Sequence, residues 1–158
     1  MTATTLSDSG LSVAGATVAD MPRHHPWREM RALPEWSVHF TSSLPWGAHG
    51  WTRWGDRTVW LRSGLTQVER RCALAHELEH VRRGPEGQGE HEEAAVEQAT
   101  ARALIVLDDL VDAVRWSLHP REVADHLWVT GDVLRCRLEH LHPSEVAALT
   151  EAIRHHMA

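Results

Sequence analysis

The sequence has no lysine, no asparagine and no tyrosine, and its only isoleucines are Ile105 and Ile153. All 16 basic residues are therefore arginine. The missing or scarce residue types are those whose codons are rich in A and T. The composition therefore favours a gene from a high-GC bacterium or its phage.

A surplus of positive charge is also lacking. The 22 acidic residues outnumber the 16 arginines, which gives a formal net charge of −6 at pH 7. A protein that binds nucleic acid usually neutralises the phosphates with a basic surface. We therefore do not expect direct nucleic-acid binding to be the main function.

Long apolar runs and a cationic N-terminus are absent as well. No stretch approaches the roughly 18 to 20 apolar residues that cross a bilayer, because the longest apolar run, residues 103–107, ends at Asp108. A secretory signal begins with positive charge, whereas no basic residue precedes Arg23. We expect a soluble, cytoplasmic protein without a membrane partner.

Cysteine is scarce too. The two cysteines, Cys72 and Cys136, are far apart in the sequence and show no CxxC spacing. Isolated cysteines in helical stretches usually pack as small apolar residues. We predict that both are buried and that they form neither a disulfide nor a zinc-binding pair.

The length of 158 residues, with 42 % hydrophobic and 24 % charged residues, fits one compact domain. Residues 1–22 are small and polar without an apolar period, which is typical of a disordered tail. We predict a main domain over residues 23–118 and a C-terminal helical extension, residues 119–158, that packs on the same domain.

Alternating apolar and polar residues predict β-strands in the N-terminal half. The alternation fits Trp36–Phe40, and it fits Gly50–Trp54 and Arg57–Leu61 on either side of Gly55-Asp56. A two-residue turn that begins with glycine suits type II′ geometry. The last two segments are therefore predicted to form an antiparallel hairpin.

In that hairpin Trp51 would oppose Trp60. Six of the eight tryptophans lie in this half of the chain. A buried tryptophan removes a large apolar area from water, so we expect these side chains to anchor the core of a small sheet.

From Thr66 onward the pattern is helical. Thr66 and Glu69 have the spacing of a capping box, and the helix that they begin should run to about Arg83 and stop at Gly84-Pro85. A second long helix is predicted from about Glu90 through Ile105. Shorter helices should follow over residues 108–118, 120–127, 131–141 and 143–155.

The first long helix contains the sequence His76-Glu77-Leu78-Glu79-His80, an HExxH motif. Residues four apart share a helix face, so His76 and His80 can reach one cation while Glu77 lies beside it. Two imidazole nitrogens and one carboxylate suit Zn²⁺ and leave a fourth position for water. Glu77 would take the proton of that water and pass it to the leaving amine.

The third metal ligand must come from another element, because this helix supplies only two. The candidates are His91, Glu92, Glu93 and Glu97, at or near the start of the second long helix. Glu93 and Glu97 are one turn apart on a single face. Glu93 is closer to the loop and hence to the first helix.

The stretches Val68–His80 and Glu93–Ile105, together with the preceding hairpin, resemble the ImmA/IrrE family of metallo-endopeptidases. The resemblance covers roughly residues 30–110 and implies a zincin-like domain within residues 23–118. It also implies that His76, His80 and Glu93 hold zinc and that Glu77 is the catalytic base. Glu97 and His91 remain as neighbours of the metal or as alternative ligands.

The resemblance also implies a substrate. The family typically cleaves helix-turn-helix repressors of mobile elements or stress genes, so a regulatory protease with such a repressor as its partner is expected. Two positions depart from the family pattern: Glu97 replaces a common asparagine, and the usual proline is absent at Val106-Leu107.

The fold class expected from these patterns is α+β. A small antiparallel sheet would pack on the HExxH helix and on the second, glutamate-bearing helix, with a helical extension at the C-terminus. As a hypothesis, the strand Arg57–Leu61, or its hairpin mate, offers a free edge near the zinc where an extended substrate could pair.

A rival interpretation concerns residues 122–138, which resemble a helix-turn-helix with Ala124 and Leu134 at the packing positions and Trp128 in the turn. Between His119 and His142 there are three arginines and four acidic residues. A unit with this balance is poorly suited to phosphate contacts. We expect it to close the metal domain or to dock a partner.

A second rival keeps the zinc but lacks turnover. Tyrosine is absent, so no phenol can stabilise the oxyanion that develops during peptide hydrolysis. His91, His119, His126 or an arginine would have to replace it. The terminal Arg154-His155-His156 could also touch metal, but the end of the chain is more typical of a frayed helix.

Overall fold

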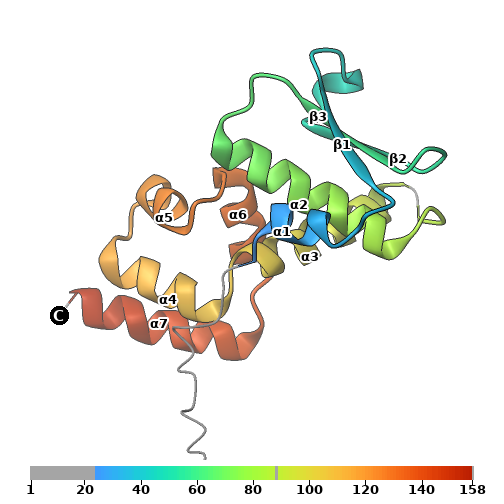
Figure 1. Cartoon of the computed structure of the whole chain (residues 1–158). Helices are drawn as coiled ribbons and strands as arrows, with labels where there is room; N and C mark the ends of the chain where they lie inside the picture. The colour runs from blue at the N-terminus through green and yellow to red at the C-terminus, as the bar shows by residue number, and fades with distance from the viewer. Residues whose placement is uncertain (1–23, 88, 158) are drawn as a thin grey trace, which may run out of the picture.

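The structure is a computed structural model that describes residues 24–87 and 89–157 (Figure 1). The predicted tail, residues 1–22, lies outside these ranges. The described chain is an α+β fold, as the sequence predicts. Its elements are α1 (Pro26–Arg31), β1 (Ser37–Thr41), the 3-10 turn η2 (Pro45–Gly47), β2 (Gly50–Arg53), β3 (Thr58–Arg62), α2 (Gln67–Arg83), α3 (Glu90–Leu104), α4 (Leu107–Trp116), α5 (Pro120–Leu127), α6 (Gly131–Glu139) and α7 (Pro143–Met157).

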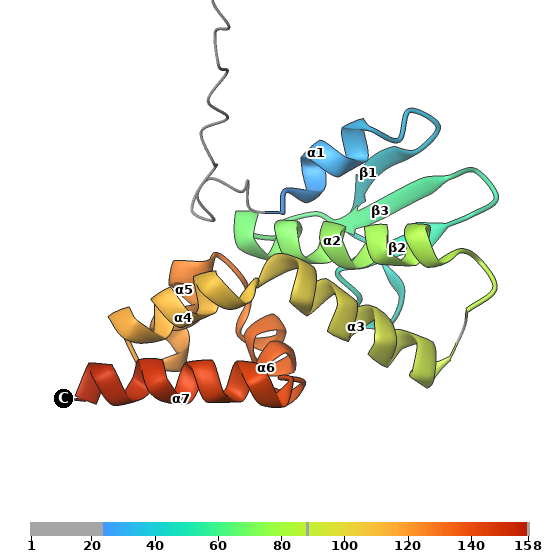
Figure 2. The same cartoon turned by 90° about the horizontal axis from the view of Figure 1, so that it is seen from below.

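Helix α2 runs through the middle of the molecule. The sheet and α1 lie on one side of it, and α3 lies on the other (Figure 2). Helices α4 to α7 gather at the end of the molecule away from the sheet (Figure 1). The sheet, α1 and α3 therefore all pack on the helix that carries the HExxH motif.

The sheet has the order β1-β3-β2. Strands β2 and β3 form the predicted antiparallel hairpin, and Trp51 opposes Trp60 as expected. Strand β1 pairs with β3 in parallel, with Val38 beside Val59, so the sheet is mixed rather than wholly antiparallel. Val59 and Leu61 are completely buried, which explains why β3 takes the central position with a neighbour on each edge.

The hairpin turn differs from the predicted type II′ turn. The loop between β2 and β3 spans four residues, 54–57, and the Arg57 N–H donates to the Trp54 carbonyl at 3.3 Å. Arg57, with φ of 51°, is the left-handed residue, and Gly55 is not. An ion pair between Arg53 and Asp56 crosses the loop. The loop is therefore longer than the two-residue turn that Gly55-Asp56 predicts, and a side-chain ion pair accompanies it.

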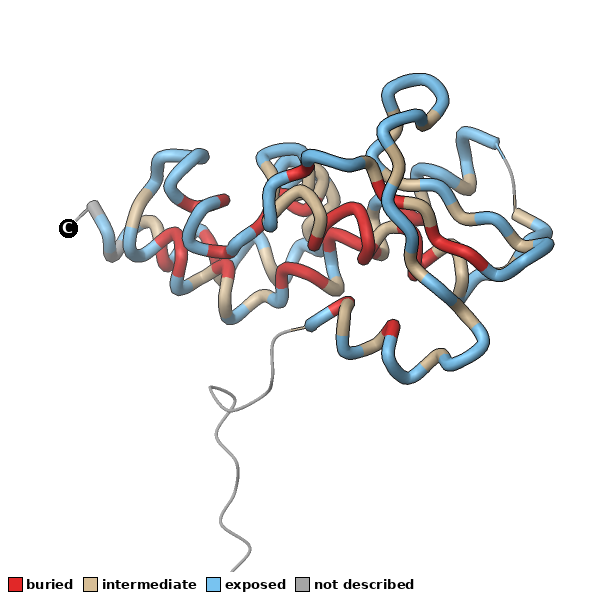
Figure 3. The backbone as a smooth tube through the Cα atoms, turned by 45° about the horizontal axis from the view of Figure 1, so that its top comes forward, coloured by how far each residue is buried: buried red, intermediate tan, exposed pale blue. Residues whose placement is uncertain are grey.

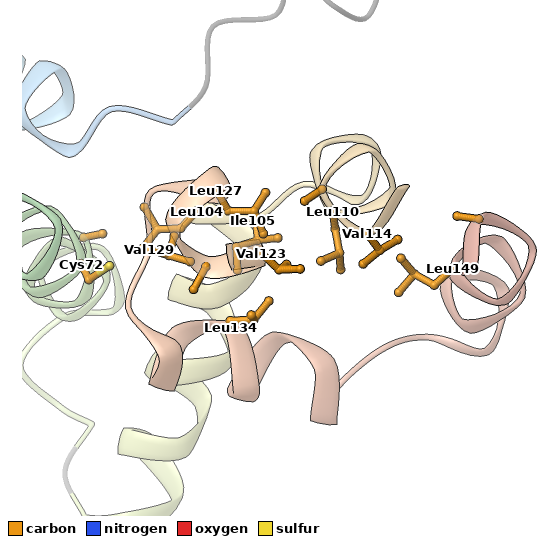
Figure 4. Close-up of a cluster of buried hydrophobic side chains, with 14 residues drawn as sticks. Cys72, Leu104, Ile105, Leu110, Val114, Val123, Leu127, Val129, Leu134 and Leu149 are labelled. Atoms are coloured by element: carbon orange, nitrogen blue, oxygen red, sulfur yellow. The ribbon is translucent and has the colours of Figure 1, made fainter. Parts of the chain in front are cut away.

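Two apolar clusters form the core, and α2 contributes to both. The first joins the sheet and α1 to α2 through Met30, Val59, Leu61, Leu65, Ala73, Leu74 and Leu78. The second joins α2 and the end of α3 to the C-terminal helices, and includes Cys72, Leu104, Ile105, Leu110, Val123, Leu134 and Leu149 (Figure 4). The C-terminal helices thus pack on the rest of the chain through a shared core. Buried stretches follow the interior of the molecule, and the peripheral turns are exposed (Figure 3).

The tryptophans only partly fill the predicted role as core anchors. Trp36 and Trp54 meet edge to face at 5.0 Å between ring centroids, and Trp36 packs against the sheet-side cluster. Trp46 is 89 % exposed and Trp51 is 41 % exposed. The side chain of Trp51 is on the strand face opposite Gly50 and Thr52, so it cannot enter the core between the sheet and α2.

The two cysteines also differ from each other. Both are free thiols, as predicted, and Cys72 is buried. Cys136 is only half-buried, and its Sγ lies 3.9 Å from Nδ1 of His140. Within residues 24–87 and 89–157, no helix is long and apolar enough to cross a membrane.

Candidate metal centre

Helix α2, which carries the HExxH motif, begins and ends at well-defined caps. At its start the Glu69 N–H donates to Thr66 Oγ1 at 3.2 Å and the Thr66 N–H donates to Glu69 Oε2 at 2.8 Å, which is the predicted capping box. Gly84, with φ of 93°, ends the helix. Leu74 and Leu78 are completely buried against the sheet side, so His76 and His80 point to another face.

Helix α3 completes a cluster of three side chains. Nε2 of His76 lies 2.8 Å from Glu93 Oε1, and Nε2 of His80 lies 3.3 Å from Glu93 Oε2. One ligand atom from each of the three residues lies within 4.8 Å of the other two. The structure therefore brings together the two motif histidines and the glutamate that the family resemblance implies.

The other ligand candidates lie elsewhere. Glu92 pairs with Arg83, whose Nη2 donates to Glu92 Oε2 at 3.0 Å, and this pair ties the start of α3 to the end of α2. His91 is exposed and does not line the cavity described below. Glu97 lines that cavity one turn after Glu93 but does not belong to the cluster of three.

The pKa shifts within the cluster follow from its contacts. The hydrogen bond with His76 is the main reason that the pKa of Glu93 is lowered. Burial acts to lower the pKa of His76, but the hydrogen bond with Glu93 and the charges of Glu77 and Glu93 together raise it. Burial and the nearby His76 lower the pKa of His80. An anionic Glu93 lies beside two imidazoles, and a metal cation could take the place of the protons in the hydrogen bonds between them.

These residues fit a divalent transition metal. Two imidazole nitrogens and one carboxylate are the donor set of many catalytic metal sites, which keep a further position for water or substrate. The three side chains line a cavity, so a metal that they held would be reached from it. Both histidines are half-buried, and their helix is anchored at each end.

Glu77 is buried next to the cluster on the sheet side. Its Oε2 accepts a hydrogen bond of 2.7 Å from Thr52 Oγ1 on β2. Burial raises the pKa of Glu77, although the charge of His76 and the hydrogen bond from the Thr52 hydroxyl act to lower it. A carboxyl group whose pKa is raised is better suited to accept and return a proton.

Gly50 makes this close approach of β2 possible. A Cβ atom at Gly50 would lie 2.5 Å from Glu77 Oε1, which no side chain tolerates without a shift. Sequence reasoning missed both Gly50 and Thr52. The available signal was their spacing, because residues two apart on a strand share one face, and both are small in a strand that also carries Trp51.

The cluster and Glu77 line one cavity of about 1070 Å³. Helix α2 forms its floor, β2 and the preceding loop form one wall, and α3 with α6 forms the other. The lining residues from α6 and its ends are Thr130, Asp132, Val133, Arg135, Cys136, Glu139 and His140. The C-terminal extension thus completes the cavity.

Helix α6 belongs to the unit that resembles a helix-turn-helix. The turn does adopt the left-handed conformation, at Trp128 with φ of 56°, and Ala124 and Leu134 are buried as expected. However, α6 packs on α3 and lines the cavity. Its Arg135 is engaged by Asp132 at 2.7 Å. This arrangement favours the packing role over a helix that reads DNA.

The three histidines predicted to replace a phenol do not line the cavity. His91, His119 and His126 are all exposed, and none of them lines it. The ring of His126 instead stacks on Trp116 at 5.5 Å between centroids. The arginine that the sequence analysis named as the other replacement is present, because Arg135 lines the cavity. The lining residues also include His49 and His140, which sequence reasoning did not select.

His156, near the C-terminus, is also separate from the cluster. Nδ1 of His156 lies 2.8 Å from the Arg115 carbonyl oxygen. Helix α7 extends to Met157, so its last turn is helical and packs toward α4. The side chain of His155 lies outside the described part of the structure.

No protein-family model, no curated protein and no solved structure matches the chain. The resemblance to the ImmA/IrrE family therefore depends on the motif residues and their spacing.

Proposed function

We propose that this chain is a zinc-dependent endopeptidase in which His76, His80 and Glu93 hold the metal and Glu77 is the general base. One observation carries the proposal. The three donor atoms lie within 4.8 Å of one another. The cavity that they line is also lined by Glu77, the residue that follows His76 in the helix.

The chain's own residues would act on a peptide in a defined order. Bound Zn²⁺ would supply Lewis-acid polarisation of a peptide carbonyl and of a water molecule. Glu77 would accept a proton as the water oxygen bonds to the carbonyl carbon. It would then return this proton to the amide nitrogen as the C–N bond breaks, which yields a carboxylic acid and an amine. Thr52 would keep the Glu77 carboxylate in one orientation throughout.

Strand β2 would position the substrate. The proposed free edge at Arg57–Leu61 is wrong, because β3 is the central strand. Its hairpin mate β2 is an edge strand, paired on one side by β3 within the described residues. The Arg62 N–H donates to the His49 carbonyl at 2.8 Å, so the alternating backbone groups of Gly50 and Thr52 face outward. An extended peptide could pair with them next to Glu77.

The substrate class comes from the family resemblance. We propose a helix-turn-helix repressor of a mobile element, phage or stress response as the partner. The cavity supports a peptide substrate by its size, since about 1070 Å³ exceeds what most small ligands fill. A peptide bond in an extended or locally unfolded segment would be the site of cleavage.

The first experiment measures metal and cleavage in the same preparation. Elemental analysis of the purified protein should find close to one zinc per chain in the wild type and in Glu77→Gln. The wild type should cut the repressor that is encoded beside it, in co-expression and with purified components. Chelation and Glu77→Gln should each abolish the new protein termini that mass spectrometry detects.

Each other outcome has a defined meaning. Bound zinc with no Glu77-dependent termini, either in the repressor or across the host proteome, would indicate a non-catalytic zinc-binding protein. A chain that neither contains nor takes up a transition metal would refute the metal site. Specific operator binding without a cut would favour the helix-turn-helix interpretation.

A further inference from the structure

The wall of the cavity between α3 and α6 contains polar groups that the proposed reaction does not use. Glu97 follows Glu93 by one turn, and Thr100 follows Glu97 by three residues, so all three share one face of α3. Each of them lines the cavity. Glu139 lines it from α6.

Thr100 is the unusual member of this group. The residue is only 3 % exposed, and its Oγ1 has no hydrogen-bond partner in the structure. A buried hydroxyl without a partner is costly, and most such groups in folded proteins are satisfied. A buried hydroxyl on a residue that lines a cavity is therefore a natural contact for a ligand group that enters it.

The two carboxylates at this wall give it a negative charge. Within residues 24–87 and 89–157, neither Glu97 nor Glu139 has a hydrogen bond or ion pair with another side chain. Arg135 lines the same cavity, but its guanidinium is engaged by Asp132. Burial, and then the charges of Glu97 and Glu139, raise the pKa of Cys136, so both carboxylates act on the same thiol.

We propose that this wall is a specificity pocket for an arginine side chain of the substrate. The guanidinium would donate to the carboxylates of Glu97 and Glu139 and to Thr100 Oγ1, and the aliphatic stem would lie against Cys72, Val133 and Cys136. Arginine fits because it has several donors, no acceptor and an apolar stem. The pocket deepens the proposed peptidase function and depends on it for its role in cleavage.

The test uses binding, so that it does not require turnover. The probes are acetylated pentapeptides of alanine in which one residue is arginine, its neutral isostere citrulline, or glutamate, moved through all five positions. Zinc-loaded Glu77→Gln protein is immobilised, and the retained peptides are quantified by mass spectrometry. At one or more positions, the arginine peptide should be retained about tenfold better than the citrulline peptide, the effect of one charge-assisted hydrogen bond.

Variants then assign that preference to the pocket. Glu97→Gln combined with Glu139→Gln should reduce the preference to about twofold or less. Glu90→Gln is the matched control, because Glu90 is exposed on the same helix and does not line the cavity; it should leave the preference unchanged. Thr100→Val should weaken arginine binding about threefold, and Thr100→Ser should restore it.

The results separate the pocket from the peptidase function. Equal retention of arginine and citrulline peptides, or a preference that survives the double variant, would overturn the pocket. Cleavage by the wild type with no preference for arginine would overturn it as well, while leaving the peptidase in place. Arginine-selective binding without any cleavage by the wild type would retain the pocket and overturn the peptidase.

Discussion

The polar groups on the two sides of α2 differ in whether they have partners. On the sheet side, Glu77 is buried, and its carboxylate is held by Thr52 with Gly50 in close contact. On the side of α3 and α6, the Thr100 hydroxyl has no hydrogen-bond partner among the described residues, and Glu97 lines the cavity. One side therefore has its polar groups already paired within the protein, whereas on the other side a ligand would have to supply the missing contacts.

The cluster of His76, His80 and Glu93 carries the proposed zinc site, so removal of one of its donors should have the largest effect. His80→Ala removes one of two imidazole donors, and we expect zinc content to fall to a small fraction of one per chain, with loss of any cleavage. Elemental analysis after dialysis checks this. Full zinc occupancy in His80→Ala would refute the ligand assignment, whereas His91→Ala, outside the cluster, should keep its zinc.

Loss of the α6 wall should come next. Arg137 is 3 % exposed; it donates to the Ile105 carbonyl at 2.9 Å and pairs with Glu145 at the start of α7. Glu145→Gln leaves this buried cation without its counter-charge, which should lower the free energy of unfolding by roughly 2 to 4 kcal/mol at neutral pH. Urea unfolding measures the loss. A matched exposed change, Glu151→Gln, should cost about 0.5 kcal/mol or less.

The same pair predicts a pH dependence. The hydrogen bond from Arg137, helped by the His142 N–H and the charges of Arg137 and Arg102, lowers the pKa of Glu145 to about 2. A depressed pKa in the folded state stabilises the fold above the ordinary pKa of 4.5. The difference in unfolding free energy between wild type and Glu145→Gln should therefore be constant above about pH 5 and shrink as the pH falls toward 2. A difference that does not change with pH would contradict this account.

A side chain at Gly50 should disturb the ordered side of α2. In Gly50→Ala the new Cβ meets Glu77 Oε1 at 2.5 Å, so either β2 or the carboxylate must move. Overpacking of this kind costs about 1 to 3 kcal/mol, and turnover should fall with it. Gly55→Ala is the control, because a Cβ there meets nothing within 4 Å and Gly55 has no positive φ; thermal unfolding and a cleavage assay compare the two.

The smallest effect is expected at Thr52. Thr52→Val keeps the shape of the side chain but removes the hydroxyl that donates to Glu77. We expect a loss of about 1 kcal/mol in stability and of about tenfold in turnover. Thr52→Ser retains a hydroxyl and should recover most of both. If Thr52→Val had wild-type turnover, orientation of Glu77 by β2 would not matter for the reaction.

The features that sequence reasoning predicted correctly are local. The capping box at Thr66 and the register of Trp51 with Trp60 depend on residues a few positions apart, or on one short turn, whose geometry is almost fixed by backbone hydrogen bonding. The turn itself was predicted wrongly, since the type that Gly55 favours lost to a longer loop with Arg57 in the left-handed region. Even locally, turn type depends on more than one residue.

The sequence by itself determined that one helix would present His76 and His80 on one face at metal-binding spacing, with Glu77 beside them, because a helix repeats every 3.6 residues wherever it is packed. Only the tertiary structure decided that Glu93 completes the cluster, that β1 runs parallel to β3, and that α6 forms a wall of the cavity. These relations join segments distant in the chain. Their directions depend on how whole helices and strands bury their apolar faces together, which no local period specifies.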